Sequence, residues 1–518
     1  MNAAYAEVSE PQSLFGAAQE KFLELTSWLS SESELSRSHS EVERELHREG
    51  FELLRRLLQA HYTLRGMAEP REGVIGADGA ERTHRRQTSR KVETVFGTVE
   101  ASRTSFSGRG LAALHPSDSA LSLPEDRYSH EVRRLVSLEV SAKSYDSSLT
   151  SLERTTGAKV PKRQAEELAK KATQDFESFY EQTVVDGAEQ GELLVLSFDG
   201  KGVVMRPEHL REATRKQSKN KKNKLKSRRS KGESAGRKRM ALVAAVYGID
   251  SWSRSPEQII NGLCGVRELR PEGFKPPRPV NKRVWASLVD SPEEIIEAGF
   301  REAKARDPKN RKRWLVLVDG EEKLERLVRK VAKAEGVKVT LVLDFIHALE
   351  YLWKAGTALH PEGTPELETW VMERLKRLLE GKVSTMVAGM RRAATRRKLS
   401  KKRRAPIDKA AKYLLKRKSM TAYDELLEAG APIASGVIEG TCRHLINDRL
   451  DITGARWSLD GAEAILKLRA LVASGDFDQY WLFHERVEHI RNHKLHYEAG
   501  RPPTVEMPKT LAHLRLVK

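Results

Sequence analysis

The chain has 518 residues, of which 32% are charged and 39% hydrophobic, and its formal net charge at pH 7 is +19. No apolar run approaches the roughly 20 residues of a membrane span, and the first turns of the sequence lack the basic start and apolar core of a secretory signal. Two cysteines, Cys264 and Cys442, exclude a disulfide framework and a zinc ribbon. We therefore expect a cytoplasmic, non-membrane protein of roughly three to four domains.

The first part of the chain divides into two predicted regions. Residues 1–88 hold apolar side chains at helical spacing and then a polar, glycine-rich stretch from 66 to 87, which predicts a helical region and a linker. Residues 89–128 begin with alternating apolar residues from Lys91 to Phe106, which predict a β-hairpin turning near Gly97, followed by a connector.

Residues 129–185 return to a helical period in three stretches. The second stretch stops at Thr156-Gly157, and the third opens with Pro161, which suits the first turn of a helix. A short helix, a glycine-containing turn and a helix that begins Lys162-Arg163-Gln164 fit a helix-turn-helix, whose second helix reads the major groove. A three-helix region without DNA-binding function is the alternative interpretation.

Residues 190–360 have α/β character. The run Leu193–Phe198 ends at Asp199, and the run Trp314–Val318 ends at Asp319. We predict strands at 193–199, 201–206 and 240–247, the first two forming a hairpin, and then alternating helices and strands. Three strands followed by helix, strand, helix, strand, helix is the order of a ribonuclease H-like fold.

The rest of the chain is predicted to be helical. Residues 361–430 form a helical insertion, residues 431–475 form closing helices that carry Glu439, and residues 476–518 form a C-terminal tail. The predicted fold class is therefore a multidomain, mostly α-helical protein, with an N-terminal helical and helix-turn-helix region and an α/β ribonuclease H-like catalytic domain interrupted by a helical insertion.

Lysine and arginine gather in two blocks, residues 211–239 and 391–404. Such blocks are the electrostatic signature of a nucleic-acid partner, and a solvated basic loop is the alternative. Together with the start of the third helical stretch, the first block gives the candidate DNA-binding residues: Lys162, Arg163, Gln164, Lys201, Arg206, Arg215, Lys216, Lys224, Lys226, Arg228, Arg229, Lys231, Arg237, Lys238 and Arg239.

Asp199, Asp319 and Glu439 are the candidate catalytic and metal-binding residues. Carboxylates at the carboxyl ends of buried strands meet at one edge of an open sheet, where α/β folds place their ligands. Hard cations such as Mg²⁺ or Mn²⁺ take oxygen ligands, and a pair of such ions supports phosphodiester chemistry. The alternative is that the two aspartates only end strands and that Glu439 is a surface residue.

Several stretches resemble the insertion-sequence transposases of the ISKra family. They are Asp199-Gly200-Lys201-Gly202-Val203-Val204-Met205-Arg206-Pro207, the basic stretch through Lys231-Gly232-Glu233, Arg237-Lys238-Arg239-Met240-Ala241, Asp344-Phe345-Ile346-His347, Leu349-Glu350-Tyr351-Leu352-Trp353, Gly436-Val437-Ile438-Glu439-Gly440 and Gly454-Ala455-Arg456-Trp457-Ser458. The likeness extends from about residue 90 to 475. It implies a DDE transposase that binds transposon ends and catalyses metal-dependent DNA cleavage and strand transfer.

The resemblance implies a role for each acid. Asp199 would be the first acid, Asp319 the second and Glu439 the third, with Asp344 as the rival for the second position. Asp344-x-x-His347 is also similar to the Asp/Cys-x-x-His element of Mutator-like transposases, so His347 is a candidate for contacting DNA or assisting the leaving group. Arg443 lies one helical turn beyond Glu439 and is a candidate partner for it.

Two other functions fit the same pattern. One is a ribonuclease H-like nuclease that only hydrolyses, and the other is a DNA-binding regulator derived from a transposase. The Gly-x-x-x-x-Gly-Lys-Ser/Thr frame is absent, so we expect no nucleotide cofactor. The expected partner is double-stranded DNA in the nucleoid, both transposon ends and target, bound by a homodimer or larger multimer with Mg²⁺ or Mn²⁺.

Overall fold

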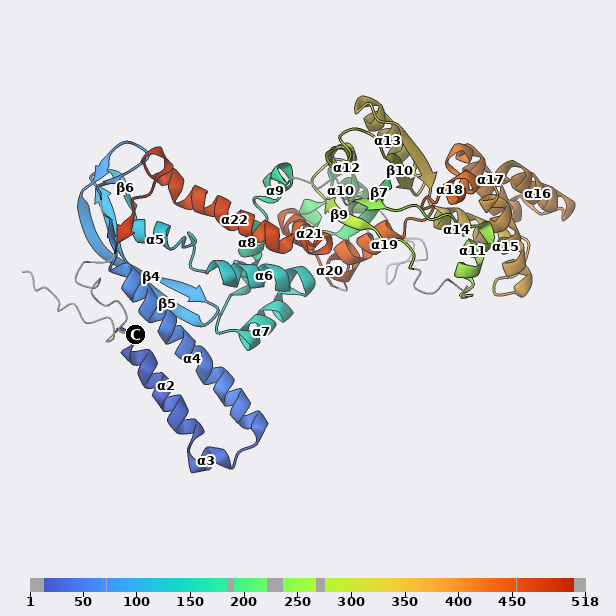
Figure 1. The fold of residues 1–518 in the computed structure, drawn as a ribbon. Helices are drawn as coiled ribbons and strands as arrows, with labels where there is room; N and C mark the ends of the chain where they lie inside the picture. Colours follow the sequence, from blue (N-terminus) through green and yellow to red (C-terminus); the bar gives the residue numbers. More distant parts are fainter. Residues whose placement is uncertain are drawn as a thin grey trace, which may run out of the picture. The chain divides into compact units, whose positions relative to one another are not determined.

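The computed structural model describes residues 14–70, 72–183, 191–220, 236–266, 275–452 and 454–506. The chain divides into two compact units. The terminal unit comprises residues 1–181 and 477–518, and the central unit comprises residues 182–476. Both contain helices and strands, with helix predominating (Figure 1). None of the helices within these ranges is at once long and apolar enough to cross a membrane.

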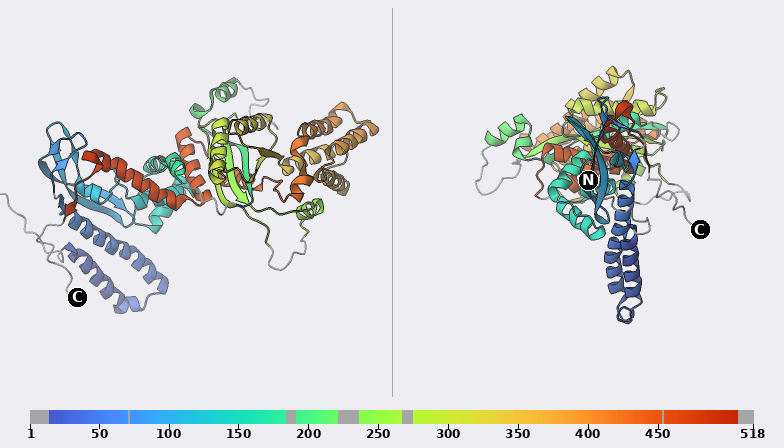
Figure 2. Two further views of the ribbon diagram at one scale, coloured as in Figure 1. Left: turned by 45° about the horizontal axis from the view of Figure 1, so that its top comes forward. Right: turned by 90° about the vertical axis from the view of Figure 1, so that its left-hand side faces the viewer.

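The terminal unit begins with a helical hairpin formed by α2 and α4 (Figures 1 and 2). Its elements are α2 (Gly16–Leu29), α3 (Glu32–Leu35) and α4 (His39–Gly66). A capping box between Ser38 and Glu41 fixes the start of α4. The helical prediction is thus confirmed from residue 16 onward. The expected linker was wrong in part, because it contains the short strands β1 (Glu69–Pro70), β2 (Val74–Ile75) and β3 (Glu81–Arg82).

The predicted β-hairpin is confirmed. Strands β4 (His84–Thr94) and β5 (Gly97–Gly108) pair antiparallel with Thr94 opposite Gly97, and β6 (Leu111–Leu114) adds a third strand. Gly97 has φ +113°, a value that favours glycine at the turn. The first strand begins at His84, inside the expected linker, because its exposed residues pair along the whole of β5.

Helices fill the rest of the terminal unit. They are α5 (Pro116–Ala120), α6 (His130–Ala142), α7 (Tyr145–Thr155), α8 (Lys162–Lys171), α9 (Phe176–Gln182) and, after the central unit, α22 (Phe477–Asn492), with short turns at Lys494–His496 and Glu498–Gly500 and a last strand β12 (Val505–Glu506). The three predicted helical stretches are confirmed, although the third breaks into α8 and α9. The expected tail is a structural part of this unit, since Arg133 of α6 forms a buried ion pair with Glu488 of α22 at 2.6 Å.

A five-stranded mixed sheet forms the core of the central unit. Its strands are β7 (Leu193–Val204), β8 (Lys238–Ile249), β9 (Val280–Ser287), β10 (Arg313–Val318) and β11 (Val339–Leu343). The strand order is β11-β10-β7-β8-β9. Strands β7, β8 and β9 pair antiparallel, whereas β10 and β11 run parallel to β7. Most side chains of β7 and β10 are fully buried, as their apolar sequences require.

The predicted hairpin between residues 193–199 and 201–206 was wrong. Residues Leu193–Val204 form one continuous strand that pairs with β8 along its whole length. Gly202 makes room there for a side chain of β8, because a Cβ on it would lie 2.9 Å from the Cδ of Lys238. The third strand of the sheet is β9, which the prediction missed and which follows a proline-rich stretch.

Helices flank the sheet and extend away from it (Figure 2). In the first part they are α10 (Glu212–Asn220), α11 (Pro256–Leu263), α12 (Pro292–Arg306), α13 (Glu322–Ala334) and α14 (Phe345–Gly356), with a short turn at Pro207–His209. The helices predicted for residues 361–430 are confirmed as α15 (Pro365–Leu379), α16 (Val383–Arg396), α17 (Lys401–Lys416), a turn at Lys418–Met420, and α18 (Tyr423–Glu428), and we call this segment the helical insertion. The closing helices are α19 (Gly436–Cys442), a π-helical turn at Arg443–Asn447, α20 (Asp448–Leu450) and α21 (Leu459–Ser474).

Candidate active site

Strand register brings Asp199 and Asp319 to the same region of the sheet. Strands β7 and β10 run parallel with Ser197 opposite Leu317, and each acid follows two residues later. Both side chains are half-buried. Because the strands are adjacent and parallel, Asp319, just after the end of β10, lies beside Asp199, which is within β7.

Glu439 reaches the same region from α19. This helix packs against β7 and β8, and Glu439 is exposed on it. A cavity of about 180 Å³ is lined by Asp199, Asp319 and Glu439 together with Asp344 and other side chains. The remaining lining residues are Ser197, Phe198, Lys201, Leu317, Val318, Ile346, His347, Glu350, Ser435 and Ile438. The three acids predicted from the sequence therefore line one cavity, although their nearest separation in the sequence is 120 residues.

Asp344 has a different environment from Asp319, although both follow neighbouring parallel strands. Its side chain is buried, at 3% relative exposure, and accepts hydrogen bonds from three donors. They are the backbone N–H of Ile346 at 2.9 Å, the Nδ1 of His347 at 3.2 Å and the hydroxyl of Ser435. Asp344 thus caps α14 and links it to the residue before α19, so its lone pairs are largely occupied within the protein.

These contacts shift two pKa values. Burial acts to raise the pKa of Asp344, but the hydrogen bonds from His347, Ser435 and the Ile346 backbone outweigh it and lower the pKa below its ordinary value. The hydrogen bond to Asp344 raises the pKa of His347, against the opposing effect of burial. His347 therefore carries a proton over a wider pH range than a free histidine, and Asp344 holds it at the edge of the cavity.

The turn that carries Asp319 is held by the helical insertion. Gly320 has φ +84°, and a Cβ there would lie 2.7 Å from both the hydroxyl of Tyr413 and the Nε of Arg417. The hydroxyl of Tyr413 donates to the backbone carbonyl of Asp319 at 2.6 Å, and the guanidinium of Arg417 donates to that of Gly320. The side chain of Arg417 also stacks over the ring of Tyr413, 4.3 Å from its centroid.

A second insertion residue holds the neighbouring strand end. Tyr423 is fully buried, and its hydroxyl donates to the backbone carbonyl of Leu343 at 2.8 Å, immediately before Asp344. The insertion therefore fixes the backbone at both strand ends that carry an aspartate. Sequence reasoning missed Tyr413, Arg417 and Tyr423, because nothing in a helical period indicates a hydroxyl bonded to a carbonyl tens of residues away.

The remaining side-chain contacts correct the expectation for Arg443 and show partners that the sequence did not indicate. Ser435 precedes α19 as its N-cap residue, but its hydroxyl bonds to Asp344 instead of capping the helix. Arg443 is exposed and lies 3.6 Å from Asp448, so its ion pair is with that residue and not with Glu439. Cys442 also has a role that the sequence did not indicate, since its thiol donates to Asp199 Oδ2 at 3.2 Å. Burial and the Asp199 carboxylate raise the pKa of this thiol.

The candidate DNA-binding residues fall into three groups. Lys162, Arg163 and Gln164 are exposed at the start of α8, whose opposite face is buried. In the central unit Arg206, Arg215, Lys216, Arg237 and Lys238 are also exposed, with Lys216 paired to Glu212 and Lys238 to Asp451. Lys224, Lys226, Arg228, Arg229 and Lys231 lie outside the described residues.

Two members of that set have other surroundings. Lys201 is half-buried and lines the cavity of the three acids. The guanidinium of Arg239 donates to the backbone carbonyls of Leu288 at 2.9 Å and His209 at 3.3 Å. Arg239 therefore connects β8 to neighbouring loops of its own unit, which is a structural role.

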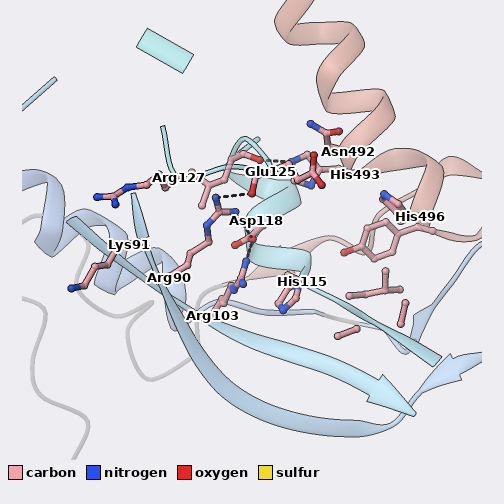
Figure 3. Close-up of a pocket in the computed structure, with 15 residues that line it drawn as sticks. Arg90, Lys91, Arg103, His115, Asp118, Glu125, Arg127, Asn492, His493 and His496 are labelled. Carbon is pink, nitrogen blue, oxygen red and sulfur yellow. Dashed lines mark hydrogen bonds and ion pairs between the residues drawn. The ribbon is translucent and has the colours of Figure 1, made fainter. Parts of the chain in front are cut away.

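A larger cavity, of about 540 Å³, lies in the terminal unit (Figure 3). Its lining is rich in arginine and histidine, and Arg90, Arg103 and Arg127 have acidic partners within the protein. Arg90 and Arg103 both point at Asp118, and Arg90 also donates to the carbonyl of Pro124 at 2.8 Å. This network joins the β-hairpin to α5 and the following connector. We therefore assign it to the stability of the fold.

The chemistry of the three acids suits a hard cation. Asp199, Asp319 and Glu439 offer carboxylate oxygens to one cavity, which are the ligands that Mg²⁺ and Mn²⁺ prefer. Within the described ranges, no three His, Cys, Asp or Glu side chains are drawn together as a ready-made ligand set. The acids are therefore gathered at one cavity without being preassembled around an ion.

Comparisons with known proteins add no family to these observations: no protein-family model and no curated protein matches the chain.

Proposed function

We propose that this protein is a DDE transposase, which binds the ends of a DNA element, cleaves DNA there and joins the freed 3′-hydroxyl to a target. The observation that carries the proposal is the convergence of Asp199, Asp319 and Glu439 on one cavity. The strand order β11-β10-β7-β8-β9, with three antiparallel strands followed by two parallel ones, supports a ribonuclease H-like fold for the central unit. The insertion between β11 and α19 fits the same class.

In this proposal the three acids hold two Mg²⁺ or Mn²⁺ ions. When bound, such ions activate an attacking oxygen and stabilise the leaving oxygen of a phosphodiester. Asp319 is the better second acid because its side chain is half-buried and accepts a hydrogen bond from the backbone N–H of Glu321 at 2.8 Å, a smaller set of donors than Asp344 has. Asp344 is committed to His347 and Ser435, so we assign it a positioning role.

Two cations of the cavity complete the assignment. Lys201 lines the cavity from β7 and supplies positive charge for a phosphate group. His347, held by Asp344, presents its ring to the cavity in a form that is protonated more readily than a free histidine. We assign it a hydrogen bond to a phosphate oxygen or to the departing 3′-oxygen.

DNA binding is assigned to exposed cations in both units. The arrangement of α6, α7 and α8, which pack on one another and leave Lys162, Arg163 and Gln164 exposed, supports a helix-turn-helix. Strand transfer joins two DNA ends to one target, so we propose a dimer or larger multimer on DNA. The mass of the purified complex on paired ends tests this, and one active monomer would contradict it.

The experiment is a strand-transfer assay on labelled DNA taken from the sequences that flank the gene, with Mg²⁺ or Mn²⁺. The wild type is compared with Asp199→Asn, Asp319→Asn, Glu439→Gln and Asp344→Asn. Glu350→Gln is the matched control, because Glu350 lines the same cavity but pairs with Lys354 at 2.9 Å on its own helix. We expect the first three variants to lose joined products by at least about a hundredfold, Asp344→Asn to keep some activity and the control to keep all of it.

Other outcomes lead to different functions. Cleavage without joining by the wild type would identify a nuclease that only hydrolyses. Tight binding to the correct ends without any chemistry would identify a DNA-binding regulator. Equal activity of Glu350→Gln and Asp319→Asn would disprove the assignment of the acids. The transposase activity would then be tested with variants of other residues.

A further inference from the structure

The turn between α16 and α17 concentrates positive charge at one end of the helical insertion. Residues 391–404 contain nine lysines and arginines and no aspartate or glutamate. We call this group the basic tip. Its members are Arg391, Arg392, Arg396, Arg397, Lys398, Lys401, Lys402, Arg403 and Arg404.

Most of the basic tip has no acidic partner. Eight of its nine side chains are exposed, and the ninth, Arg404, is half-buried and pairs with Asp408 at 3.2 Å. Arg397 donates to the backbone carbonyl of Leu359 at 2.6 Å. Across the described part of the chain, no ion pair joins any of the other seven to an aspartate or glutamate. A patch with this much uncompensated charge attracts a polyanion.

The position of these cations destabilises the protein in the absence of a bound anion. Four members of the basic tip, Lys401 to Arg404, occupy the first turn of α17, and that turn contains no acid. The positive end of the helix dipole lies there and disfavours further cations. The four also repel one another and the cations at the end of α16. A bound polyanion would relieve this repulsion.

The other end of α17 holds the proposed active site. Tyr413, near its last turn, and Arg417, just after it, bond to the backbone carbonyls of Asp319 and Gly320. A helix of 16 residues spans about 24 Å at 1.5 Å per residue. That length corresponds to about seven base pairs of duplex DNA at 3.4 Å each.

We propose that the basic tip binds the sugar–phosphate backbone of duplex DNA about seven base pairs from the bond that reaches Asp319. α17 would then act as a rigid spacer between the DNA contact and the acid-bearing turn. The binding itself rests on the charge and exposure of the tip alone. Its position relative to the scissile bond rests on the proposed transposase function.

The test compares full-length wild type with the variant Lys401→Gln/Lys402→Gln/Arg403→Gln. The matched control is Lys323→Gln/Arg326→Gln/Lys333→Gln, which removes three exposed cations from α13. Binding of a fluorescent duplex of arbitrary sequence is titrated between about 50 and 200 mM salt. We expect the tip variant to bind the duplex at least tenfold more weakly than the wild type. The magnitude of its slope of log affinity against log salt should be smaller by about 2 to 3. The control variant should have the affinity and the slope of the wild type.

Three readouts keep the proposal falsifiable. The tip variant should melt at or above the melting temperature of the wild type, because the substitutions remove only repulsion between cations. A lower melting temperature together with lost DNA binding would show that the three side chains support the fold, and would contradict a direct contact with DNA. Unchanged affinity and an unchanged salt slope in the tip variant would overturn the proposal. A tip variant that binds an RNA hairpin more weakly than the wild type does, but binds duplex DNA equally well, would also overturn it. Because binding is measured without catalysis, a wild type that binds DNA but joins none would disprove the transposase and leave the basic tip supported.

Discussion

At the scale of single residues, surroundings decide what a carboxylate can do. Asp319 and Asp344 each follow a strand of the same parallel pair, and Val318 lies opposite Leu343 in that pair. Asp344 is buried among three donors, whereas Asp319 is half-buried beside a cavity. The two aspartates occupy equivalent places in the sheet but differ in how many carboxylate lone pairs remain free. Asp319 has more of them and is the one suited to bind an ion.

The ion pair of Asp344 and His347 predicts a pH dependence of stability. The lowered pKa of Asp344 contributes stability that is present above about pH 4 and lost as the pH falls through its folded value. The raised pKa of His347 contributes stability that is fully present below about pH 6.5 and lost as the pH rises through its folded value, which lies higher. Both contributions are therefore present between about pH 4 and 6.5.

Urea unfolding of the wild type and His347→Gln at several pH values tests this. The free energy of unfolding should differ most between about pH 5 and 6, and the difference should shrink as the pH rises above neutral. His360→Gln is the control, because His360 has no carboxylate bonded to it within the described residues and burial lowers its pKa. A difference that stays constant from pH 5 to 9 would contradict the pair.

At the scale of elements, the helical insertion acts as a support for the sheet edge. Tyr413 and Arg417 fix the turn after β10, Tyr423 fixes the end of β11, and the ring of Tyr413 stacks on Tyr351 of α14 with centroids 3.9 Å apart. The insertion therefore contacts both aspartate-bearing turns through main-chain carbonyls. Such contacts orient a side chain by fixing its backbone.

Tyr413→Phe removes one of these contacts and keeps the stacked ring. We expect a loss of about 1 kcal/mol in the free energy of unfolding, because the carbonyl of Asp319 loses a donor. Strand transfer should fall by more than that loss of stability explains. Tyr351→Phe is the matched control, since it alters a hydroxyl in the same stack without touching the turn. Equal activity of the two variants would show that the hydroxyl of Tyr413 does not position Asp319.

Sequence patterns predicted the elements whose signals are local. The apolar run before Asp319 gave the end of β10, and the run before Asp199 gave the first half of β7, which continues to Val204. Helical periods gave α6, α7, α8 and the insertion. The hairpin expected within 193–206 was wrong because Gly202 makes room for the Lys238 side chain of β8, which only the paired strand reveals. Strand β9 was missed because its first half is polar.

The candidate site was predicted in part for a similar reason. Asp199 and Asp319 each follow an apolar run, which carries a signal in the sequence. The partners of those acids come from distant segments: Ser435 lies 91 residues from Asp344, and Cys442 lies 243 residues from Asp199. No local pattern marks a serine or a cysteine as the donor to a remote carboxylate, so these contacts required the folded chain.

At the scale of the whole molecule, the terminal unit is held together by buried charges contributed from both ends of the sequence. Arg133 bonds to Asp126 and Glu488, and Asp175 bonds to His484 and Arg491. The side chains of Arg133 and Glu488 are at 3% and 8% relative exposure. Removing one partner of such a pair leaves a buried charge without compensation.

Arg133→Met should therefore destabilise the terminal unit by about 3 kcal/mol. In calorimetry we expect the transition of this unit to move to lower temperature while that of the central unit stays in place. Arg134→Met is the control, because Arg134 is the next residue on α6 and pairs with the more exposed Glu131 and Asp478. A shift of both transitions together would show that the two units unfold as one.

The discontinuity of the terminal unit has a consequence for synthesis on the ribosome. Residues 1–181 are made before the central unit, but their partners in 477–506 are made only after it. Domains generally fold as the chain is made, in order from the N-terminus, so the central unit can complete its core while the terminal unit still lacks α22. A chain that is cut short before residue 477 would carry all three acids without a finished terminal unit. Synthesis through α22 is then a condition for a folded terminal unit.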